Sequence, residues 1–323
     1  MNSVTSEVSQ RSIGPFCRNI AALKPFFEDP RCVEIMLNAD GTVWIERAGE
    51  GMKPAARLED WRADALMKNL ATFLNKSLTY DSPLLNGELP LDPPFLGARF
   101  SGAIPPVTAA PTFSIRKKAT VIYTLEDYVR DGIMTERQRV ILSSNVEERK
   151  NILVVGGTGS GKTTLLNALI AEMVRQNDSQ RFFIIEDTGE LQCAGKNVLQ
   201  YHTSNAVNMT DCLKQALRNR PDRILVGEVR DAVALDMLDA WNTGHEGGLA
   251  TVHANSARAA LARLRSLVNR AEHPPKDIDE IIGEVVHLIV FIVRTPTGRE
   301  IKEIVRVDGY DSHAQEYLLE EIK

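Results

Sequence analysis

The sequence has little cysteine, no long apolar run and no strong compositional bias. Each of these absences argues against a class of protein or a kind of site. Among 323 residues there are four cysteines, which form no CxxC pair and have no histidine at zinc-ligand spacing. This argues against a zinc site, and isolated thiols suit a reducing compartment. The 21 glycines and 15 prolines are ordinary numbers, so the chain is neither disordered nor collagen-like. The cysteines are Cys17, Cys32, Cys193 and Cys212.

No stretch reaches the run of about 18 apolar residues that a membrane span requires. The best candidate, residues 281–293, is interrupted by Gly283, Glu284 and His287. The first 20 residues lack the apolar core of a signal peptide. A net charge of −5 provides no general attraction to nucleic acid or anionic lipid. We therefore expect a cytoplasmic protein, and the sequence leaves peripheral attachment to a membrane machine open.

Length and residue pattern predict two domains. Residues 12–120 combine short β-rich runs, one helical pattern and a proline-rich stretch, which indicates a small α+β domain. Residues 121–134 are interpreted as a linker. From 135 to 323, strand and helix patterns alternate as in parallel α/β domains, and an antiparallel pair of strands follows. The expected fold class is therefore α/β, preceded by a smaller α+β domain.

In the first domain we expect a hairpin around Asp40-Gly41, a helix over 60–78 and strands over 97–104 and 112–116. In the second domain, helical and strand-like patterns alternate along the chain. The expected elements there are strands over 151–155, 182–185, 224–226, 249–252, 285–293 and 301–307 and helices over 163–175, 211–218 and 231–241.

One motif carries specific chemistry. Residues 156–163 read GGTGSGKT and fit the P-loop pattern GxxxxGK[ST], between an apolar strand and an amphipathic helix. Glycines let the backbone turn its N–H groups toward phosphate oxygens, and the helix N-terminus adds partial positive charge there. Lys162 is expected to bridge the β- and γ-phosphates, and Thr163 to place its hydroxyl on Mg²⁺. The predicted nucleotide-binding residues are Gly156, Gly157, Thr158, Gly159, Ser160, Gly161, Lys162, Thr163 and Thr164.

Three further segments follow the P-loop: FIIEDTGEL at 183–191, PDRILVGEVRD at 221–231 and TGHEGGLATVHANS at 243–256. No Asn-Lys-x-Asp guanine-reading motif accompanies them, which argues against a GTPase. The segments resemble the Asp box, Walker B segment and His box of the type II/type IV secretion traffic ATPase superfamily (GspE/PulE-type), in that family's order. The length and the lack of a tetracysteine motif make the chain most similar to TrbB-type conjugal transfer ATPases.

The resemblance implies a RecA-like P-loop ATPase domain behind a PAS-like N-terminal domain. It also implies an ATP-hydrolysing, Mg²⁺-dependent ring motor, a homo-oligomer and specifically a hexamer. Such a motor powers assembly or substrate transfer at the inner membrane, together with other components of a secretion or conjugation machine. In this family, arginines of the first domain reach the nucleotide phosphates, a role that falls here on Arg99 and Arg116.

Catalysis of γ-phosphate hydrolysis needs a carboxylate that orients water. Glu228 follows an apolar strand, so we expect it at the strand end where ligands of open α/β sheets bind. The position before it is Gly227 where a Walker B segment usually has Asp. Mg²⁺ is then held through water or by Glu186 and Asp187, to which the resemblance gives a metal- and water-positioning role. The competing interpretation of Glu228 is a surface glutamate in a salt bridge. For Glu186 and Asp187 it is a structural role in a turn or a helix cap.

The resemblance assigns His253, at the end of another strand, the role of γ-phosphate sensor, with His245 as a second candidate. A histidine after an apolar run can instead belong to the core. Several arginines near the Walker B segment are further candidates for phosphate or subunit contacts. They are Arg218, Arg220, Arg223 and Arg230.

Two other functions share this core. A nucleic-acid motor or recombinase would need a basic track interleaved with aromatic residues. The basic runs at 116–118 and 263–270 lack such aromatics, so the sequence does not favour direct nucleic-acid binding. A nucleotide-gated scaffold without turnover is the third hypothesis, and the presence of Glu228 argues against it.

Overall fold

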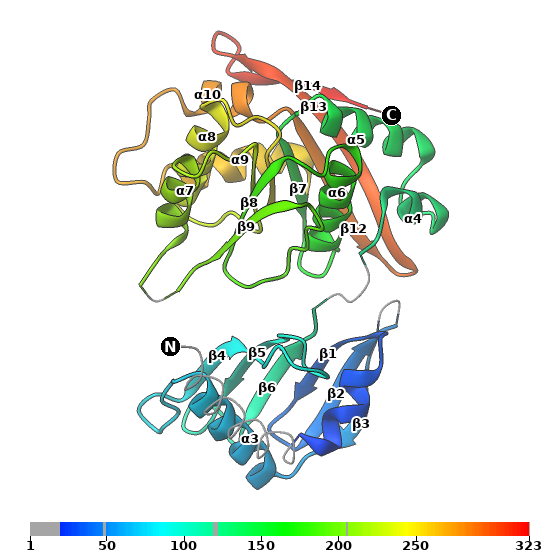
Figure 1. The fold of residues 1–323 in the computed structure, drawn as a ribbon, viewed down its shortest axis with the longest axis vertical. Helices are drawn as coiled ribbons and strands as arrows, with labels where there is room; N and C mark the ends of the chain where they lie inside the picture. The colour runs from blue at the N-terminus through cyan, green and yellow to red at the C-terminus, as the bar shows by residue number, and fades with distance from the viewer. Residues whose placement is uncertain (1–19, 48–49, 119–121, 205, 323) are drawn as a thin grey trace. The chain divides into compact units, whose positions relative to one another are not determined.

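The computed structural model describes residues 20–47, 50–118, 122–204 and 206–322, in two compact units that divide between Thr120 and Val121 (Figure 1). The start of the predicted first domain, residues 12–19, lies outside the described residues, as does Cys17. Within the described residues, no helix is both long enough and apolar enough to cross a bilayer.

The first unit is an antiparallel sheet with helices on one face. Its strand order is β3-β2-β1-β6-β5-β4. The predicted hairpin is confirmed, because β1 and β2 pair around Asp40-Gly41 and Gly41 adopts φ +78°. The elements are η1 (Ala21–Leu23), α2 (Lys24–Glu28), β1 (Cys32–Leu37), β2 (Thr42–Arg47), β3 (Met52–Arg57), α3 (Asp60–Phe73), β4 (Leu84–Glu88), β5 (Arg99–Ala103) and β6 (Thr112–Arg116).

Strand alternation separates the two faces of this sheet. Ile35, Ile45, Phe100 and Ile115 are buried against α3, while the neighbouring residues on each strand point to the opposite face. The predicted helix over 60–78 ends earlier, at Phe73, and β3 and β4 are additional strands that the sequence pattern did not reveal.

The second unit is built on a mixed sheet of order β14-β13-β12-β7-β11-β10-β8-β9, in which β12 to β9 are parallel neighbours. All the strands and helices predicted for this unit are present, with shifted bounds. They are α4 (Leu125–Arg130), α5 (Glu136–Glu147), β7 (Ile152–Gly156), α6 (Lys162–Gln176), β8 (Arg181–Glu186), β9 (Asn197–His202), α7 (Met209–Leu217), β10 (Arg223–Val226), α8 (Val233–Asn242), β11 (Leu249–His253), α9 (Ala257–Val268), α10 (Ile278–Val285), β12 (Leu288–Thr295), β13 (Gly298–Asp311) and β14 (Glu316–Glu321).

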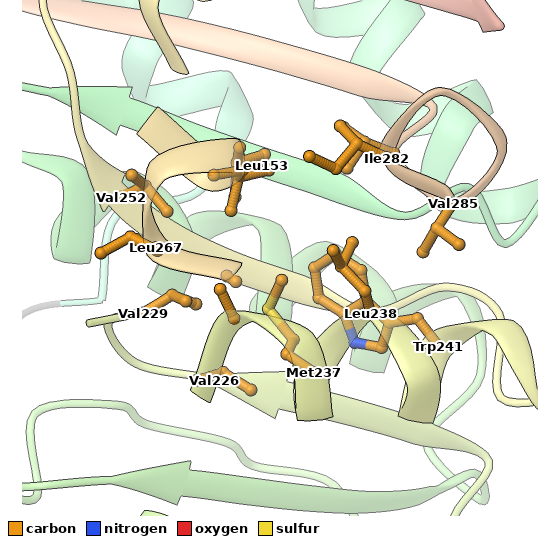
Figure 2. Packing of buried hydrophobic residues seen from close by; sticks show 14 of the residues in the cluster. Leu153, Val226, Val229, Met237, Leu238, Trp241, Val252, Leu267, Ile282 and Val285 are labelled. Carbon is orange, nitrogen blue, oxygen red and sulfur yellow. The ribbon is translucent and has the colours of Figure 1, made fainter. Parts of the chain in front are cut away.

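Helices cover both faces of the central parallel strands, so β7, β8 and β10 contain continuous buried apolar runs in the sequence. Along β7, Leu153 and Val155 pack into one cluster with α7, α8, α9 and α10 (Figure 2). Ile152 and Val154 pack into the other cluster, with α4, α5 and α6. Trp241 of α8 is fully buried and donates its indole N–H to the carbonyl of Ile224 on β10. Both layers therefore hold β7, the strand that leads into the P-loop.

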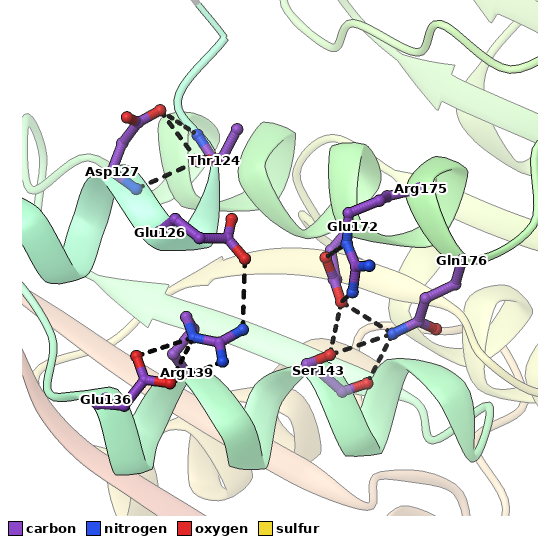
Figure 3. A network of polar contacts seen from close by, with 9 residues as sticks. All are labelled: Thr124, Glu126, Asp127, Glu136, Arg139, Ser143, Glu172, Arg175 and Gln176. Atoms are coloured by element: carbon purple, nitrogen blue, oxygen red, sulfur yellow. Dashed lines mark hydrogen bonds and ion pairs between the residues drawn. The ribbon is translucent and has the colours of Figure 1, made fainter.

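A polar network links α4, α5 and α6 (Figure 3). The carboxylate of Glu172 on α6 is buried and accepts hydrogen bonds from Ser143, Arg175 and Gln176. Burial acts to raise the pKa of Glu172, but the hydrogen bond from Arg175 and the others outweigh it and lower the pKa. Arg139 joins α5 to α4 through Glu126.

The predicted linker, residues 121–134, contains the helix α4. Helix α4 begins with a capping box formed by Thr124 and Asp127, and its Leu125 and Tyr128 are buried. The sequence pattern missed this helix because it has only 6 residues, below the length over which helical periodicity is readable.

Asn151, which precedes β7, forms hydrogen bonds to the segments that lead into β11 and β12. Its side-chain oxygen accepts the N–H groups of Gly247 and Gly248, and its amide nitrogen donates to the carbonyl of Val285. The backbone N–H of Asn151 donates to Nδ1 of His287 at 2.9 Å. Since Nδ1 accepts this bond, His287 must be neutral there. Burial, followed by the nearby Lys150, lowers the pKa of His287.

Acidification is expected to weaken the fold through His287. Below the unfolded-state pKa of about 6.5, the unfolded chain binds a proton that the folded chain resists, so the free energy of unfolding falls as the pH falls. Urea denaturation between about pH 7.5 and 5.5, on either side of that pKa, measures this slope. His287→Gln offers an uncharged acceptor, so its stability should depend less on pH in this range. Equal slopes for the two proteins would contradict the assignment.

Candidate functional site

The carboxyl ends of the parallel strands bring the P-loop, Glu186, Glu228 and His253 to one edge of the sheet of the second unit. The P-loop connects β7 to α6, and β7 lies between β12 and β11. His253 is the last residue of β11 and is the register partner of Gly156 in β7. Glu186 ends β8, and Glu228 lies two residues beyond the end of β10. This edge is where ligands bind in open α/β sheets.

The P-loop itself is shaped to receive an anion. Lys162 is the first residue of α6 and is largely buried, and its ammonium donates to the carbonyls of Gly156 and Gly157 at 3.0 and 2.8 Å. The hydroxyl of Ser160 is buried and has no hydrogen-bond partner among the described residues. A buried orphan hydroxyl is costly, and a phosphate oxygen would satisfy it.

Gly161 caps the amino end of α6 in the left-handed conformation, at φ +97°. A Cβ at this position would also lie 2.8 Å from Cδ of Arg299 on β13. The backbone conformation therefore favours glycine here, and the flexible Arg299 side chain would have to shift to admit a Cβ. The remaining predicted residues lie as expected in the loop and first turn of α6: Gly157, Thr158 and Gly159 are exposed, and Thr163 and Thr164 are half-buried.

Three side chains from different elements form a chain of contacts at this edge: Lys162 begins α6, His253 ends β11, and Glu228 follows β10. The ammonium of Lys162 lies 3.4 Å from Nδ1 of His253, and Nε2 of His253 lies 3.4 Å from a carboxylate oxygen of Glu228. Because an ammonium can only donate, Nδ1 accepts and the ring proton is placed on Nε2, facing Glu228. Burial, followed by the charge of Lys162, lowers the pKa of His253, which keeps the ring neutral near pH 7.

Glu228 is also bound by Arg230. The guanidinium Nε and Nη2 donate to the two carboxylate oxygens at 2.8 and 2.6 Å. Burial acts to raise the pKa of Glu228, but the hydrogen bond from Arg230 and the nearby positive charges outweigh it. The net effect is a lowered pKa, so Glu228 is an ionised carboxylate at neutral pH and can accept a proton or orient water.

Glu186 has a different environment. It is buried, and one carboxylate oxygen accepts the backbone N–H groups of Glu190 and Leu191 at 2.8 and 2.9 Å. The other oxygen accepts from the side chain of Gln200. A Cβ on Gly227 would approach Cβ of Glu186 to 2.9 Å. The missing Walker B aspartate thus has a steric reason, because the stem of Glu186 fills that space.

The loop after β8 has supports that the sequence pattern did not predict. Asn167 of α6 donates to the carbonyl of Glu190 and accepts the N–H of Gln192. Asp187, the first residue of this loop, accepts a hydrogen bond from Thr203 at 2.8 Å. A signal for Asn167 existed in the sequence, since it is a polar residue on an otherwise apolar stretch of the helix.

Two expectations about the site are corrected. His245 lies in the segment that precedes β11, at the amino edge of the sheet and therefore away from the P-loop. Arg223 begins β10 at that same edge and is buried, donating to Gln180 and to the carbonyls of Val146 and Gly247. Sequence order within a motif did not indicate at which end of a strand each residue lies.

The two arginines predicted in the first unit lie next to each other. Arg99 of β5 and Arg116 of β6 are register partners, exposed on the sheet face opposite α3. Glu34 of β1 is the register partner of Arg116 on the other side. Glu88 of β4 is the register partner of Arg99, so the two arginines lie between two glutamates in the register of the sheet.

Comparison of the sequence with known proteins matches it to proteins of secretion and conjugal transfer systems, and the fold matches a solved ATPase structure. The family model for type II/IV secretion system proteins matches residues 97–307. The probable conjugal transfer protein TrbB of Sinorhizobium fredii is 47% identical over 283 residues, covering 88% of this chain and 85% of the relative. The type IV secretion system protein VirB11 of Bartonella henselae is 29% identical, covering 91% and 92%. The structure of the Legionella pneumophila ATPase DotB matches with a TM-score of 0.62 at 19% identity, over 85% of this chain and 76% of that one, which supports the fold.

Proposed function

Because this chain belongs to the type II/IV secretion system protein family, we propose that it is the ATP-hydrolysing motor of a type IV secretion or conjugal transfer system. The observation that carries the proposal is the contact chain Lys162–His253–Glu228 beside the P-loop. It connects the P-loop ammonium with an ionised carboxylate, and phosphoryl transfer to water uses a cation at the phosphates and a residue that positions the water.

In the proposed reaction, the P-loop N–H groups and Lys162 bind the β- and γ-phosphates, replacing the loop carbonyls that the ammonium contacts here. Glu228 orients the attacking water, and His253 connects the γ-phosphate end of the site with that carboxylate. Glu186 acts through the loop that it holds, because its oxygens already accept three hydrogen bonds.

We propose that Mg²⁺ binds at this edge together with the nucleotide. Over the parts of the chain that the structure describes, no group of three or more His, Cys, Asp or Glu side chains could hold a metal ion. Mg²⁺ in such sites needs few protein ligands, since nucleotide phosphates and water supply most of the coordination. The hydroxyl of Thr163 and the carboxylate of Asp187 would hold it, and the ion would neutralise charge on the β- and γ-phosphates.

The fold details support a RecA-like assignment for the second unit and a PAS-like one for the first. A central parallel sheet with helices on both faces carries the P-loop after β7, and the first unit is an antiparallel sheet with helices on one face. We further propose that Arg99 and Arg116 contact nucleotide phosphates, that the motor is a hexameric ring, and that it works in the cytoplasm at the inner membrane with other components of its machine.

Solution mass and phosphate release test this proposal together. At low micromolar concentration with Mg-ATP, we expect a particle near six times 35.8 kDa that releases phosphate from ATP. A stable monomer in both the presence and absence of nucleotide would contradict the ring. A hexamer that binds ATP without releasing phosphate would favour the nucleotide-gated scaffold.

A nucleic-acid motor is the alternative, and several residues of the basic runs considered for it are engaged within the protein. The ammonium of Lys117 donates to the backbone carbonyls of Phe27 and Asp29, both at 2.7 Å. Arg265 and Arg270 pair with aspartates of the same unit. Salt-dependent DNA retention in a filter assay would support this alternative, and its absence at low salt would exclude it.

A further inference from the structure

We propose that Arg230 is the positioning residue of the hydrolytic site: its guanidinium fixes the orientation of the Glu228 carboxylate from which water is activated. This inference rests on the proposed ATPase function and adds a residue to it. The sequence made the arginines near the Walker B segment candidates for phosphate or subunit contacts. The inference gives Arg230 a different role.

The local backbone places the two side chains together. After β10 ends at Val226, the backbone N–H of Val229 donates to the carbonyl of Thr251 on β11, so the chain continues beside that strand. Val229 is buried in the core. Glu228 and Arg230 flank Val229 in the sequence, and their side chains meet through the hydrogen bonds that Arg230 donates to Glu228.

The contact between them is directional as well as electrostatic. Two parallel N–H···O bonds, at 2.8 and 2.6 Å, define the plane of the Glu228 carboxylate, which a single charge could not do. Nη1 of Arg230 also lies 3.8 Å from a carboxylate oxygen of Asp187. Arg230 therefore connects the loops that follow two neighbouring strands, β8 and β10, and its own position is supported from both.

The contact of Glu228 with His253 constrains its carboxylate less than the contact with Arg230 does. Nε2 of His253 approaches only one oxygen of Glu228, at 3.4 Å, and the Glu228 side chain is 26% exposed. A carboxylate has about four acceptor positions, so two bonds from Arg230 leave room for water. A displacement of about 1 Å in such a group costs on the order of a hundredfold in rate.

A double-mutant cycle tests the inference. Arg230→Gln is expected to lower kcat for ATP hydrolysis on the order of ten- to a hundredfold, with KM for ATP and Kd for ADP unchanged within about threefold. Arg230→Lys keeps the charge but not the paired hydrogen bonds and should recover only part of kcat. Because Arg230 acts through Glu228, Arg230→Gln should cause no further loss when added to Glu228→Gln. Radiolabelled ATP makes the residual turnover of these variants measurable.

Arg270 provides a matched control. It is similarly exposed and pairs with Asp231, the residue next to Arg230. Its ion pair therefore lies beside the proposed one in sequence but does not include Glu228. Arg270→Gln should hydrolyse ATP like the unmodified protein.

The possible outcomes separate the two levels of the proposal. In the first outcome, the unmodified protein hydrolyses ATP and Arg230→Gln raises KM for ATP. In the second, Arg230→Gln lowers kcat by the same factor whether Glu228 is present or replaced by Gln. In both, Arg230 contacts nucleotide or a subunit, and the inference fails alone. If the folded, unmodified protein does not hydrolyse ATP, the proposed function fails and the inference fails with it. Loss confined to kcat and absent in the Glu228→Gln background supports both.

Discussion

Replacing Lys162 with alanine is expected to weaken nucleotide binding by at least about a hundredfold, or about 3 kcal/mol. The substitution removes a buried ammonium at the amino end of α6, where it would bond two phosphate groups of the nucleotide. It also removes the donor that faces Nδ1 of His253. Isothermal titration with ADP and with a non-hydrolysable ATP analogue measures the affinity.

The control for this variant is Lys214→Ala, which removes an exposed lysine on α7. Its nucleotide affinity should equal that of the unmodified protein. Because Lys162→Ala also leaves the carbonyls of Gly156 and Gly157 without this donor, circular dichroism must establish that the variant is folded. A folded Lys162→Ala protein with ordinary affinity and turnover would contradict the assignment of the P-loop as the nucleotide site.

Glu228→Gln is expected to lower kcat by about 10² to 10⁴, the usual range for loss of a general base, while nucleotide affinity stays within a few-fold. Glutamine keeps the size of the side chain but cannot accept the proton of the attacking water. It also ends the charge-assisted pair with Arg230. Phosphate release under saturating Mg-ATP measures kcat, and titration measures affinity separately.

Glu246→Gln is the matched control, because Glu246 is exposed and lies ahead of β11, at the amino edge of the sheet. It should release phosphate at the rate of the unmodified protein. An undiminished rate in Glu228→Gln would mean that another group orients the water, and the contact chain through His253 would lose its catalytic interpretation.

Local signals predicted much of the second unit. The P-loop motif requires its strand and helix as direct neighbours, so β7 and α6 were predictable from the motif and the flanking apolar runs. The covered faces of β8, β10 and β11 appear as continuous apolar runs in the sequence. Glu228 and His253 could be placed at strand ends because each follows such a run.

Elements with weak local patterns were not predictable in the same way. Strand β9 alternates between half-buried and exposed residues at the edge of its sheet, and β3 is almost wholly exposed. Helix α4 is short, and its Leu125 and Tyr128 are buried by tertiary packing against α5 and α6. In each case the element is stabilised by pairing or packing with other elements: β8 for β9, β2 for β3, and α5 and α6 for α4.

The sequence by itself determined that this chain has a phosphate-binding loop, a carboxylate and a histidine at strand ends, and the segment order of its family, because each is a local pattern with a local physical cause. Only the tertiary structure decided which of these groups meet. Parallel crossovers set β11 beside β7 and β10 beside β11, which brings His253 between Lys162 and Glu228 and leaves His245 at the other edge. Register and side-chain direction depend on contacts among residues far apart in the chain, which no local pattern contains.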